Sequence, residues 1–243
     1  ISLATSADGF LMAGSADGTL RGWPNAADHS AGDSPSQAGF PSAIATIALH
    51  PGKPETALGL GDATLLIFGD RKPLRAETRQ RGVRVAVWTP DGRYVVTGGA
   101  DGRVVWWDPS TGQPLEEGVA LSAEIGSLTF SEQGDWLIAG DWNGQLAWID
   151  AASRKVVGQV RQPNAVSGMA AIAGAVVTAS WDGTLRVWSH PQRELKAEIA
   201  TGRTLSGLCV DRSQTHLATH TQTGSVLLWS LKALRDRAGL AEP

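Results

Sequence analysis

One short pattern occurs six times along this sequence at nearly even spacing. Each copy has a turn, most often Asp-Gly or Asn-Gly, followed by a short run ending in a large apolar side chain, as in DGTLRVW at residues 182–188. The terminal apolar residues are Trp23, Phe68, Trp107, Ile149, Trp188 and Trp229, separated by 45, 39, 42, 39 and 41 residues. Such a period predicts a chain of repeated units, each of which buries its apolar face against its neighbours.

Each repeat is expected to form four short strands. Asp-Gly between two apolar runs is the strongest short-range hairpin signal, because both central positions must tolerate positive φ. A second turn lies upstream, as at residues 90–92, and a third follows the aromatic residue, as at 109–112. The 29 Gly in the sequence also disfavour helices, because each costs about 1 kcal/mol relative to Ala there. The pattern therefore predicts an all-β fold, and its period matches the roughly 40–45 residues of a four-stranded propeller blade.

These residues resemble the WD-repeat family. Trp107-Asp108 is the dipeptide that names the family, and residues 98–102 and 179–183 are similar to its Gly-Ser-x-Asp-Gly segment. The resemblance implies an all-β β-propeller of four-stranded antiparallel blades over residues 1–230, with a seven-bladed ring lacking one blade as the alternative to six. The six repeats are expected near residues 1–43, 44–82, 83–124, 125–165, 166–204 and 205–238.

Three parts of the sequence depart from that pattern. The family's Gly-His pair is absent from every repeat, so its hydrogen-bonded His–Ser/Thr–Asp–Trp set is incomplete throughout. Residues 24–42 are rich in Pro, Ala, Ser, Gly and Asp, and are expected to form a long loop in place of the first repeat's outer strand. Residues 231–243 are expected to be a C-terminal tail, a short helix or the last outer strand. Because the chain opens at Ile1 inside an expected strand, we expect it to be part of a larger chain or complex.

Two sets of repeated residues are expected to be structural. Buried aromatic side chains on the third strand contribute a few kcal/mol each to stability. Turn carboxylates accept hydrogen bonds from the backbone that follows. The first set is Trp23, Trp107, Trp188 and Trp229, and the second is Asp17, Asp62, Asp101 and Asp182.

No pattern in the sequence predicts catalysis, a metal or a cofactor. Cys209 is the single cysteine, and neither a Gly-x-Ser-x-Gly elbow nor a phosphate loop is present. His216 and His220 stand four apart on one expected strand, which places them roughly 13 Å apart, too far to share a zinc ion. We therefore expect a protein that is not an enzyme. The alternative is a fragment of a quinone-dependent or other propeller enzyme, because residues 107–113 resemble a motif seen in the quinone-dependent enzymes.

Trp142 and Trp181 are the candidate partner-binding residues. Each directly precedes the turn between the second and third strands, in neighbouring repeats, and the family resemblance implies that this turn lies on the usual partner-binding face. The other repeats have Ala16, Gly61, Ala100 and Gln222 at this position. Large aromatic side chains on such turns are typical interface anchors, although each ring could instead fold over its own blade. We expect a scaffold that binds a protein or peptide here, with Asp141 adding a charge beside the two rings.

A basic stretch is the second candidate site. Its members are Arg71, Lys72, Arg75, Arg79, Arg81 and Arg84. They could bind an anion or nucleic acid, or could instead protect an exposed edge strand from aggregation. The net charge of −3 disfavours nucleic-acid binding by the average surface. No apolar run reaches the roughly 18 residues of a membrane helix, so we expect no membrane insertion and a soluble protein, with the cytoplasm as the default compartment.

Overall fold

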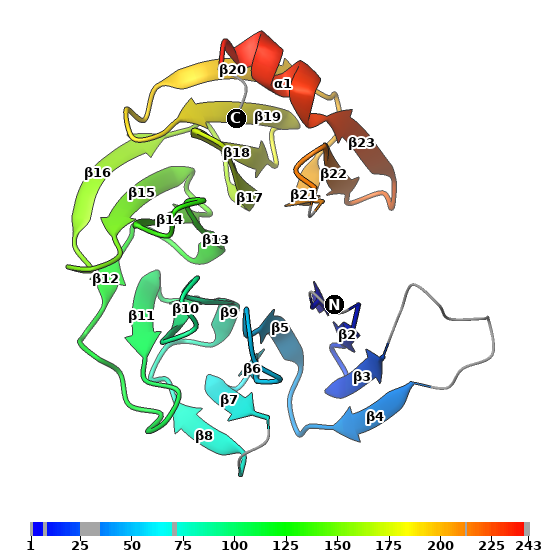
Figure 1. Ribbon diagram of the computed structural model, residues 1–243, viewed down its shortest axis with the longest axis vertical. Coiled ribbons are helices and arrows are strands. Elements are labelled where there is room, and N and C mark those ends of the chain that lie inside the picture. The colour runs from blue at the N-terminus through cyan, green and yellow to red at the C-terminus, as the bar shows by residue number, and fades with distance from the viewer. Residues whose placement is uncertain (1, 7–8, 25–34, 70–71, 212, 241–243) are drawn as a thin grey trace. The chain divides into compact units, whose positions relative to one another are not determined.

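The computed structural model describes residues 2–6, 9–24, 35–69, 72–211 and 213–240. These residues form six antiparallel sheets in which the strands follow one another in chain order (Figure 1). Six successive sheets of this kind are the blades of an all-β propeller, which confirms the expected fold class. The chain divides into two compact units, residues 1–120 and 121–243, and each unit holds three of the sheets.

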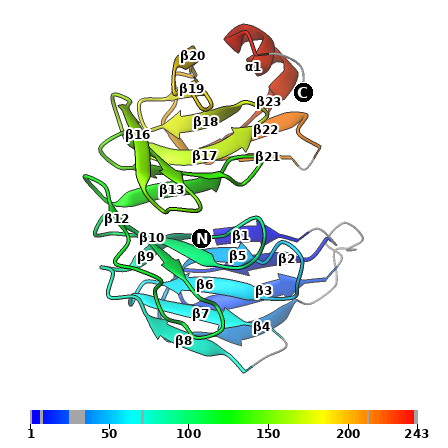
Figure 2. The same cartoon turned by 60° about the vertical axis from the view of Figure 1, so that its left-hand side comes forward.

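The first unit contains sheets 1 to 3. Sheet 1 comprises β1 (Ser2–Thr5), β2 (Leu11–Gly14), β3 (Thr19–Trp23) and β4 (Ser36–Gly39). Sheet 2 comprises β5 (Ile44–Leu49), β6 (Thr56–Leu60), β7 (Thr64–Phe68) and β8 (Leu74–Glu77). Sheet 3 comprises β9 (Val83–Trp88), β10 (Val95–Gly99), β11 (Arg103–Trp107) and β12 (Val119–Ala120). The first strands of consecutive sheets, β1, β5 and β9, are in contact (Figure 2).

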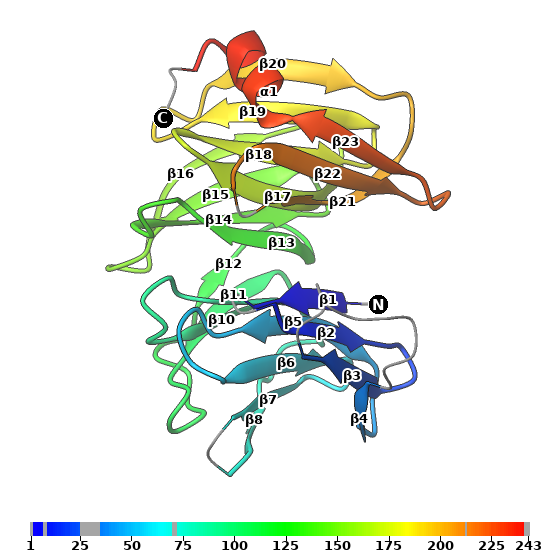
Figure 3. The same cartoon turned by 45° about the vertical axis from the view of Figure 1, so that its right-hand side comes forward.

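The second unit contains sheets 4 to 6 and the helix. Sheet 4 comprises β13 (Ile125–Phe130), β14 (Trp136–Asp141), β15 (Gln145–Asp150) and β16 (Val156–Arg161). Sheet 5 comprises β17 (Val166–Ile172), β18 (Ala175–Ser180), β19 (Thr184–Ser189) and β20 (Leu195–Ala200). Sheet 6 comprises β21 (Leu205–Val210), β22 (His216–Thr221) and β23 (Val226–Ser230), and α1 (Leu231–Ala238) follows it (Figure 3).

The cores lie between consecutive sheets, and single strands contribute to two of them. Alternate residues of a strand face opposite sides of its sheet. In β19, Leu185 and Val187 therefore face the core shared with sheet 6, whereas Trp188 faces the core shared with sheet 4. This alternation lets sheet 5 join both sheet 4 and sheet 6.

Part of the expected long loop is a strand instead. Ser36–Gly39 pairs with Thr19–Gly22 of β3 as β4, so the first repeat keeps its outer strand. The small side chains at 36–39 do not prevent this pairing, because the ladder is made by backbone groups. Residues 25–34 of the same segment lie outside the described residues.

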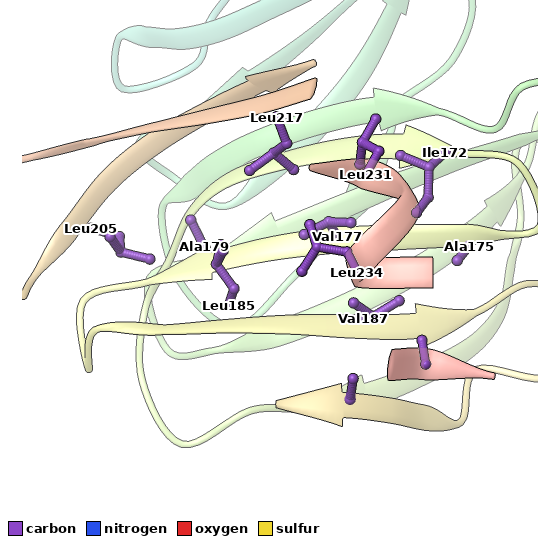
Figure 4. Close-up of a cluster of buried hydrophobic side chains, with 12 residues drawn as sticks. Ile172, Ala175, Val177, Ala179, Leu185, Val187, Leu205, Leu217, Leu231 and Leu234 are labelled. Carbon is purple, nitrogen blue, oxygen red and sulfur yellow. The ribbon is translucent and has the colours of Figure 1, made fainter. Parts of the chain in front are cut away.

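The expected last outer strand is a helix. Ser230 caps its start, accepting a hydrogen bond from the Ala233 backbone N–H, and Gly239 ends it with a left-handed φ of 64°. Leu231, Leu234 and Ala238 recur at helical spacing and are buried in the core shared by sheets 5 and 6 (Figure 4). Of the alternatives for this segment, the short helix is therefore confirmed and the strand is wrong.

Candidate protein-binding surface

The two candidate tryptophans occupy equivalent turns of sheets 4 and 5. Gly144 and Gly183 adopt φ of 81° and 79°, the left-handed conformation that these tight turns require. Their backbone N–H groups donate to the carbonyls of Asp141 and Ser180 at 3.1 and 3.0 Å. Trp142 and Trp181 are therefore held at the same place in two successive hairpins.

Both rings are partly exposed and in contact with each other. Trp142 is 43% exposed and Trp181 is 37% exposed. Their ring centroids are 5.1 Å apart, and the ring planes are tilted by 49°. Because the rings are not stacked face to face, each leaves part of its surface to solvent. The two side chains thus form one continuous aromatic patch.

The neighbouring backbone supports the Trp142 ring. A Cβ atom built on Gly126 of β13 would lie 2.8 Å from Cδ1 of the Trp142 ring, so the ring lies directly over this glycine. The Trp142 backbone N–H donates to the Glu124 carbonyl at 3.0 Å. A Cβ atom at position 126 would also lie 2.2 Å from the Val166 carbonyl oxygen, so a larger residue there would require both the ring and the backbone of β17 to shift.

Asp141 does not provide the exposed charge expected of it. Its side chain is fully buried. Four donors surround its carboxylate: the Ser122 hydroxyl at 2.6 Å and the backbone N–H groups of Ala123, Asn143 and Gln145 at 3.0, 2.9 and 2.8 Å. Burying a carboxylate is tolerable only with such hydrogen bonds. Asp141 therefore shapes the turn that carries Trp142, and its assignment as a partner contact is wrong.

The charges beside Trp181 are paired within sheet 5. Asp182 lies 2.9 Å from the Arg186 guanidinium, which also contacts Glu198 at 2.6 Å. Burial acts to raise the pKa of Asp182, but the hydrogen bond and positive charge of Arg186 outweigh it and hold the pKa below its usual value. Asp141 and Asp182, the acidic residues adjacent in sequence to the two tryptophans, are thus engaged by their own blades.

The other turn aspartates make the same local contact. Asp182 also accepts from the backbone N–H of Thr184 at 2.9 Å. Asp17, Asp62 and Asp101 accept from the residues two positions on at 2.8, 3.1 and 3.2 Å. These bonds close the turns between the second and third strands.

Two glutamines extend the hydrogen bonding of the repeated tryptophans. The indole N–H of Trp107 donates to the Thr97 hydroxyl at 2.8 Å, which donates to Gln80 Oε1 at 2.8 Å. Trp188, Thr178 and Gln162 form the same relay, at 3.2 and 2.9 Å. Sequence reasoning missed both glutamines, although each lies three or four residues before a first strand. Their amides therefore give two sheets a buried hydrogen-bond chain without the histidine that the family pattern would supply.

The remaining repeated tryptophans are less enclosed. Trp229 donates to the Thr219 hydroxyl at 3.1 Å, without a glutamine beyond it in the described residues, and is half-buried. Trp23 of sheet 1 is also half-buried. The packing of this position therefore varies from sheet to sheet.

The basic stretch is spread over several elements. Arg75 lies on the outer strand β8 and donates to Thr64 at 3.1 Å, with Asp62 at 3.7 Å. Arg79 and Arg81 lie in the loop that follows, and Arg84 is on β9. Arg71 falls outside the described residues.

Lys72 lines a hollow of sheets 2 and 3 that none of these arginines lines. This pocket of about 390 Å³ is lined by Lys53, Lys72 and Arg93, but also by the acidic Glu55, Asp91 and Asp108. The mixture of charges gives the pocket no clear preference for an anion. Of the candidate anion-binding side chains in the described residues, Lys72 alone lines this pocket.

No metal site or membrane span is found in the described part of the chain. No group of three or more His, Cys, Asp or Glu side chains there could hold a metal ion. No helix of the described residues is long and apolar enough to cross a membrane.

Comparison with known proteins identifies the repeat. Residues 73–108 and 164–189 match the family model described as "WD domain, G-beta repeat". Both segments carry the turn and third-strand tryptophan described above, in sheets 3 and 5. These two segments of the chain are WD repeats.

WD-repeat proteins of known name share part of this sequence. The guanine nucleotide-binding protein subunit beta of Solanum tuberosum is 27% identical over 170 residues, which cover 63% of this chain and 45% of that protein. The periodic tryptophan protein 2 homolog of Schizosaccharomyces pombe is 30% identical over 147 residues, covering 59% of this chain and 17% of that protein. This WD-repeat chain therefore spans less than half the length of these curated relatives.

Solved structures share the fold at low sequence identity. A chain of the mitotic checkpoint complex crystal structure has a TM-score of 0.83 at 16% identity, covering 94% of this chain and 76% of that one. The computationally designed Ika8 protein has a TM-score of 0.75 at 20% identity, covering 94% of this chain and 70% of that one. Identities this low establish the propeller fold alone. WD-repeat proteins typically act as interaction scaffolds and are usually non-catalytic.

Proposed function

We propose that this WD-repeat chain is a non-catalytic scaffold that binds a protein or peptide partner through Trp142 and Trp181. The observation that carries the proposal is the contact between two partly exposed indole rings on neighbouring turns. Exposed apolar side chains that form a patch are more informative than single ones. Tryptophan is also among the residues that most often dominate binding energy at interfaces.

The fold does not require tryptophan at these turns. Equivalent turns in the other four sheets carry small or polar residues: Ala16, Gly61, Ala100 and Gln222. If the side chain at this position were needed for packing, large residues would recur there in every sheet. The two tryptophans are therefore explained better by a partner than by the stability of their own blades.

The polar surroundings favour an apolar anchor on the partner. Asp141 is buried, and Asp182 is paired with Arg186. These acidic groups do not offer a carboxylate to a cationic ligand. An aliphatic, aromatic or prolyl side chain that covers the two rings would remove apolar surface from water at about 25 cal/mol per Å².

The names of the relatives agree with a scaffold role. They include a G-protein subunit, a U3 snoRNP-associated protein-like protein of Arabidopsis thaliana and a telomerase protein component of Rattus norvegicus. Each name describes a part of an assembly. By analogy, we propose that this chain also works within a complex.

Paired measurements on Trp181→Ala test the proposal. After a partner has been identified by pull-down, the variant should lose about 2 kcal/mol or more of binding free energy, the scale of an interface anchor. Its free energy of unfolding should change by less than about 1 kcal/mol, because the ring is partly exposed. Gln222→Ala, at the equivalent turn of sheet 6, is the matched control and should alter neither quantity. If Trp181→Ala unfolds the chain while affinity per folded molecule stays constant, the ring belongs to the core and the proposal is wrong.

A further inference from the structure

A pocket of about 670 Å³ lies between sheets 1 and 2, both of which belong to the first unit. Phe10 and Met12 line it from sheet 1, and Leu49, Thr56 and Phe68 line it from sheet 2. Thr56 is in register with both Leu49 and Phe68, so these three residues form one row across β5, β6 and β7. The pocket is separate from the Trp142–Trp181 patch, which lies in the other unit.

The corresponding row of sheet 3 carries larger side chains. It consists of Trp88, Val95 and Trp107. The two tryptophans are 6% and 2% exposed and lie in the core shared with sheet 2. Leucine and phenylalanine occupy less volume than two tryptophans, so the row of sheet 2 leaves space that the row of sheet 3 fills.

Thr56 places a hydroxyl where the fold uses an aliphatic side chain. Its residue is 5% exposed, and the hydroxyl donates to Sδ of Met12 at 3.8 Å, although a thioether is a weak acceptor. A buried polar group ordinarily has a good hydrogen-bond partner, and an exception calls for an explanation. The packing of the sheets does not explain the hydroxyl, because the corresponding residues of the other five sheets are Leu11, Val95, Leu137, Val176 and Leu217.

Two other polar side chains of the pocket are already engaged. Nδ1 of His50 accepts from the Gly52 backbone N–H at 2.9 Å, so Nε2 carries the proton that is donated to the Gly92 carbonyl at 3.1 Å. The Ser6 hydroxyl is bonded to the backbone of its own turn at 3.0 Å. The Thr56 hydroxyl is therefore the buried group that a ligand could satisfy.

From these observations we propose that the pocket binds a phenolic group, an aromatic ring that carries a hydroxyl. The ring would pack between two phenylalanines and a thioether, which are favourable contacts for an aromatic ring. The phenol oxygen would exchange a hydrogen bond with the Thr56 hydroxyl in place of the weak bond to sulfur. Lys53 and Glu55 of the lining loop carry opposite charges, so they do not favour a ligand of net charge. Apolar walls with few polar groups are typical of small-molecule sites of this volume. The proposal does not depend on the proposed function.

The two methionines of the chain provide a test that is specific to the site. Met12 lines the pocket, whereas Met169 lies in the core shared by sheets 4 and 5. In a chain labelled with ¹³C at the methionine methyl groups, p-cresol should shift the Met12 signal and leave the Met169 signal in place. Toluene has the same ring and methyl group without the hydroxyl, and it should bind about threefold or more weakly, the scale of one net hydrogen bond. A purely apolar pocket would instead prefer toluene, because toluene has no hydroxyl to desolvate.

Two substitutions separate the role of the hydroxyl from that of the space. Thr56→Val introduces the kind of side chain that the other sheets carry, so the fold should be retained. It should weaken p-cresol by about threefold or more without weakening toluene. Leu49→Trp introduces the residue of the corresponding position in sheet 3, and it should fill the pocket and abolish the Met12 shift with both compounds. The Met169 signal reports whether each variant keeps its packed core.

Three results would overturn the proposal. Toluene that binds as tightly as p-cresol, or Thr56→Val that binds p-cresol as tightly as the unsubstituted chain, would show that the hydroxyl does not select the ligand. A Met12 signal that neither compound shifts would show that the pocket is not a site.

N-acetyltyrosinamide, the neutral peptide form of tyrosine, identifies the source of the phenol. Binding tighter than that of p-cresol would assign the pocket to a tyrosine side chain of a peptide, and weaker binding would assign it to a free phenolic molecule. Both results retain the phenol as the bound group.

Discussion

At the scale of single residues, identical side chains have opposite roles depending on their place in the repeat. Trp188 on the third strand is 5% exposed and donates to Thr178. Trp181, seven positions earlier on the turn, is 37% exposed. Because the strand position lies between two sheets and the turn position lies at a sheet end, only Trp188 is enclosed by a neighbour. Trp188 therefore contributes to stability, whereas recognition of a partner is the role that we propose for Trp181.

Trp188→Ala is expected to lower the free energy of unfolding by about 3–5 kcal/mol, the range for deleting a large buried aromatic side chain. The substitution also leaves the Thr178 hydroxyl without its indole donor. Urea unfolding followed by circular dichroism measures the loss. A change below about 1 kcal/mol would show that Trp188 is not a core residue. Trp181→Ala serves as the comparison, since removal of its ring should affect stability far less.

At the scale of the element, an ion pair stabilises one turn and apolar packing stabilises the C-terminal helix. The sheet 5 turn is closed by the Asp182–Arg186 pair. Helix α1 is held by Leu231 and Leu234, which are 1% and 3% exposed. Both elements depend on contacts beyond their own backbone, and both can be tested separately.

The Asp182–Arg186 pair should make stability depend on acid. The pKa of Asp182 is lower in the folded state than its usual value, so its contribution is present above the unfolded pKa of about 3.9 and is lost as the pH falls through the folded value. Between pH 6 and pH 3 the unsubstituted chain should therefore lose more unfolding free energy than Asp182→Asn does. Urea titrations at both pH values give this difference. Equal losses in the two proteins would contradict the pairing.

Leu234→Ala should destabilise the chain by about 2–5 kcal/mol, because the side chain fills the core shared by sheets 5 and 6. Lys232→Ala on the exposed side of the helix is the control. Its contact with Asp236 is a surface ion pair, which is worth about 0–1 kcal/mol. If both substitutions had the same small effect in thermal or urea unfolding, α1 would be a loosely attached tail rather than part of the core.

At the scale of the whole molecule, the net charge and the positions of the basic residues favour the proposed scaffold over a polyanion binder. The net charge is −3, and the basic residues between 75 and 84 lie on β8, its following loop and β9. Nucleic-acid binding predicts an affinity that falls steeply with salt, and cofactor-dependent catalysis predicts the absorption of a bound cofactor. A scaffold with an aromatic anchor has neither property.

Partner affinity should therefore depend weakly on salt. A nucleic-acid site with several phosphate contacts loses about 10³–10⁵ in affinity between 50 and 200 mM salt. Binding through Trp142 and Trp181 should change by less than about tenfold over that range, because apolar burial is not screened. Titration of the identified partner at both salt concentrations measures this. The ultraviolet–visible spectrum of the purified protein is the companion measurement, since a bound quinone or haem would absorb above about 300 nm.

Much of the fold could be predicted from the sequence because its signals are local. The tight turns need residues that tolerate positive φ, and alternating strands place every second side chain on one face. Both signals involve residues that are neighbours in the sequence. The strands of all six sheets therefore fall within the expected repeats, which are marked by residues such as Trp107 and Trp188. The positions of Trp142 and Trp181 at equivalent turns follow from the same pattern, while their role in binding stays a prediction.

Tertiary structure decided the properties that depend on a neighbour in space. Asp141 is buried because four donors converge on it, and Gln80 and Gln162 act in relays because a threonine and a tryptophan lie within reach. Leu231–Ala238 becomes a helix because its apolar residues meet a core at helical spacing. The sequence alone determined the repeat, the turns and the all-β fold class, since these arise from backbone preferences within a few residues. Burial and hydrogen-bond partners required the packed sheets, since both depend on what lies beside a strand rather than along it.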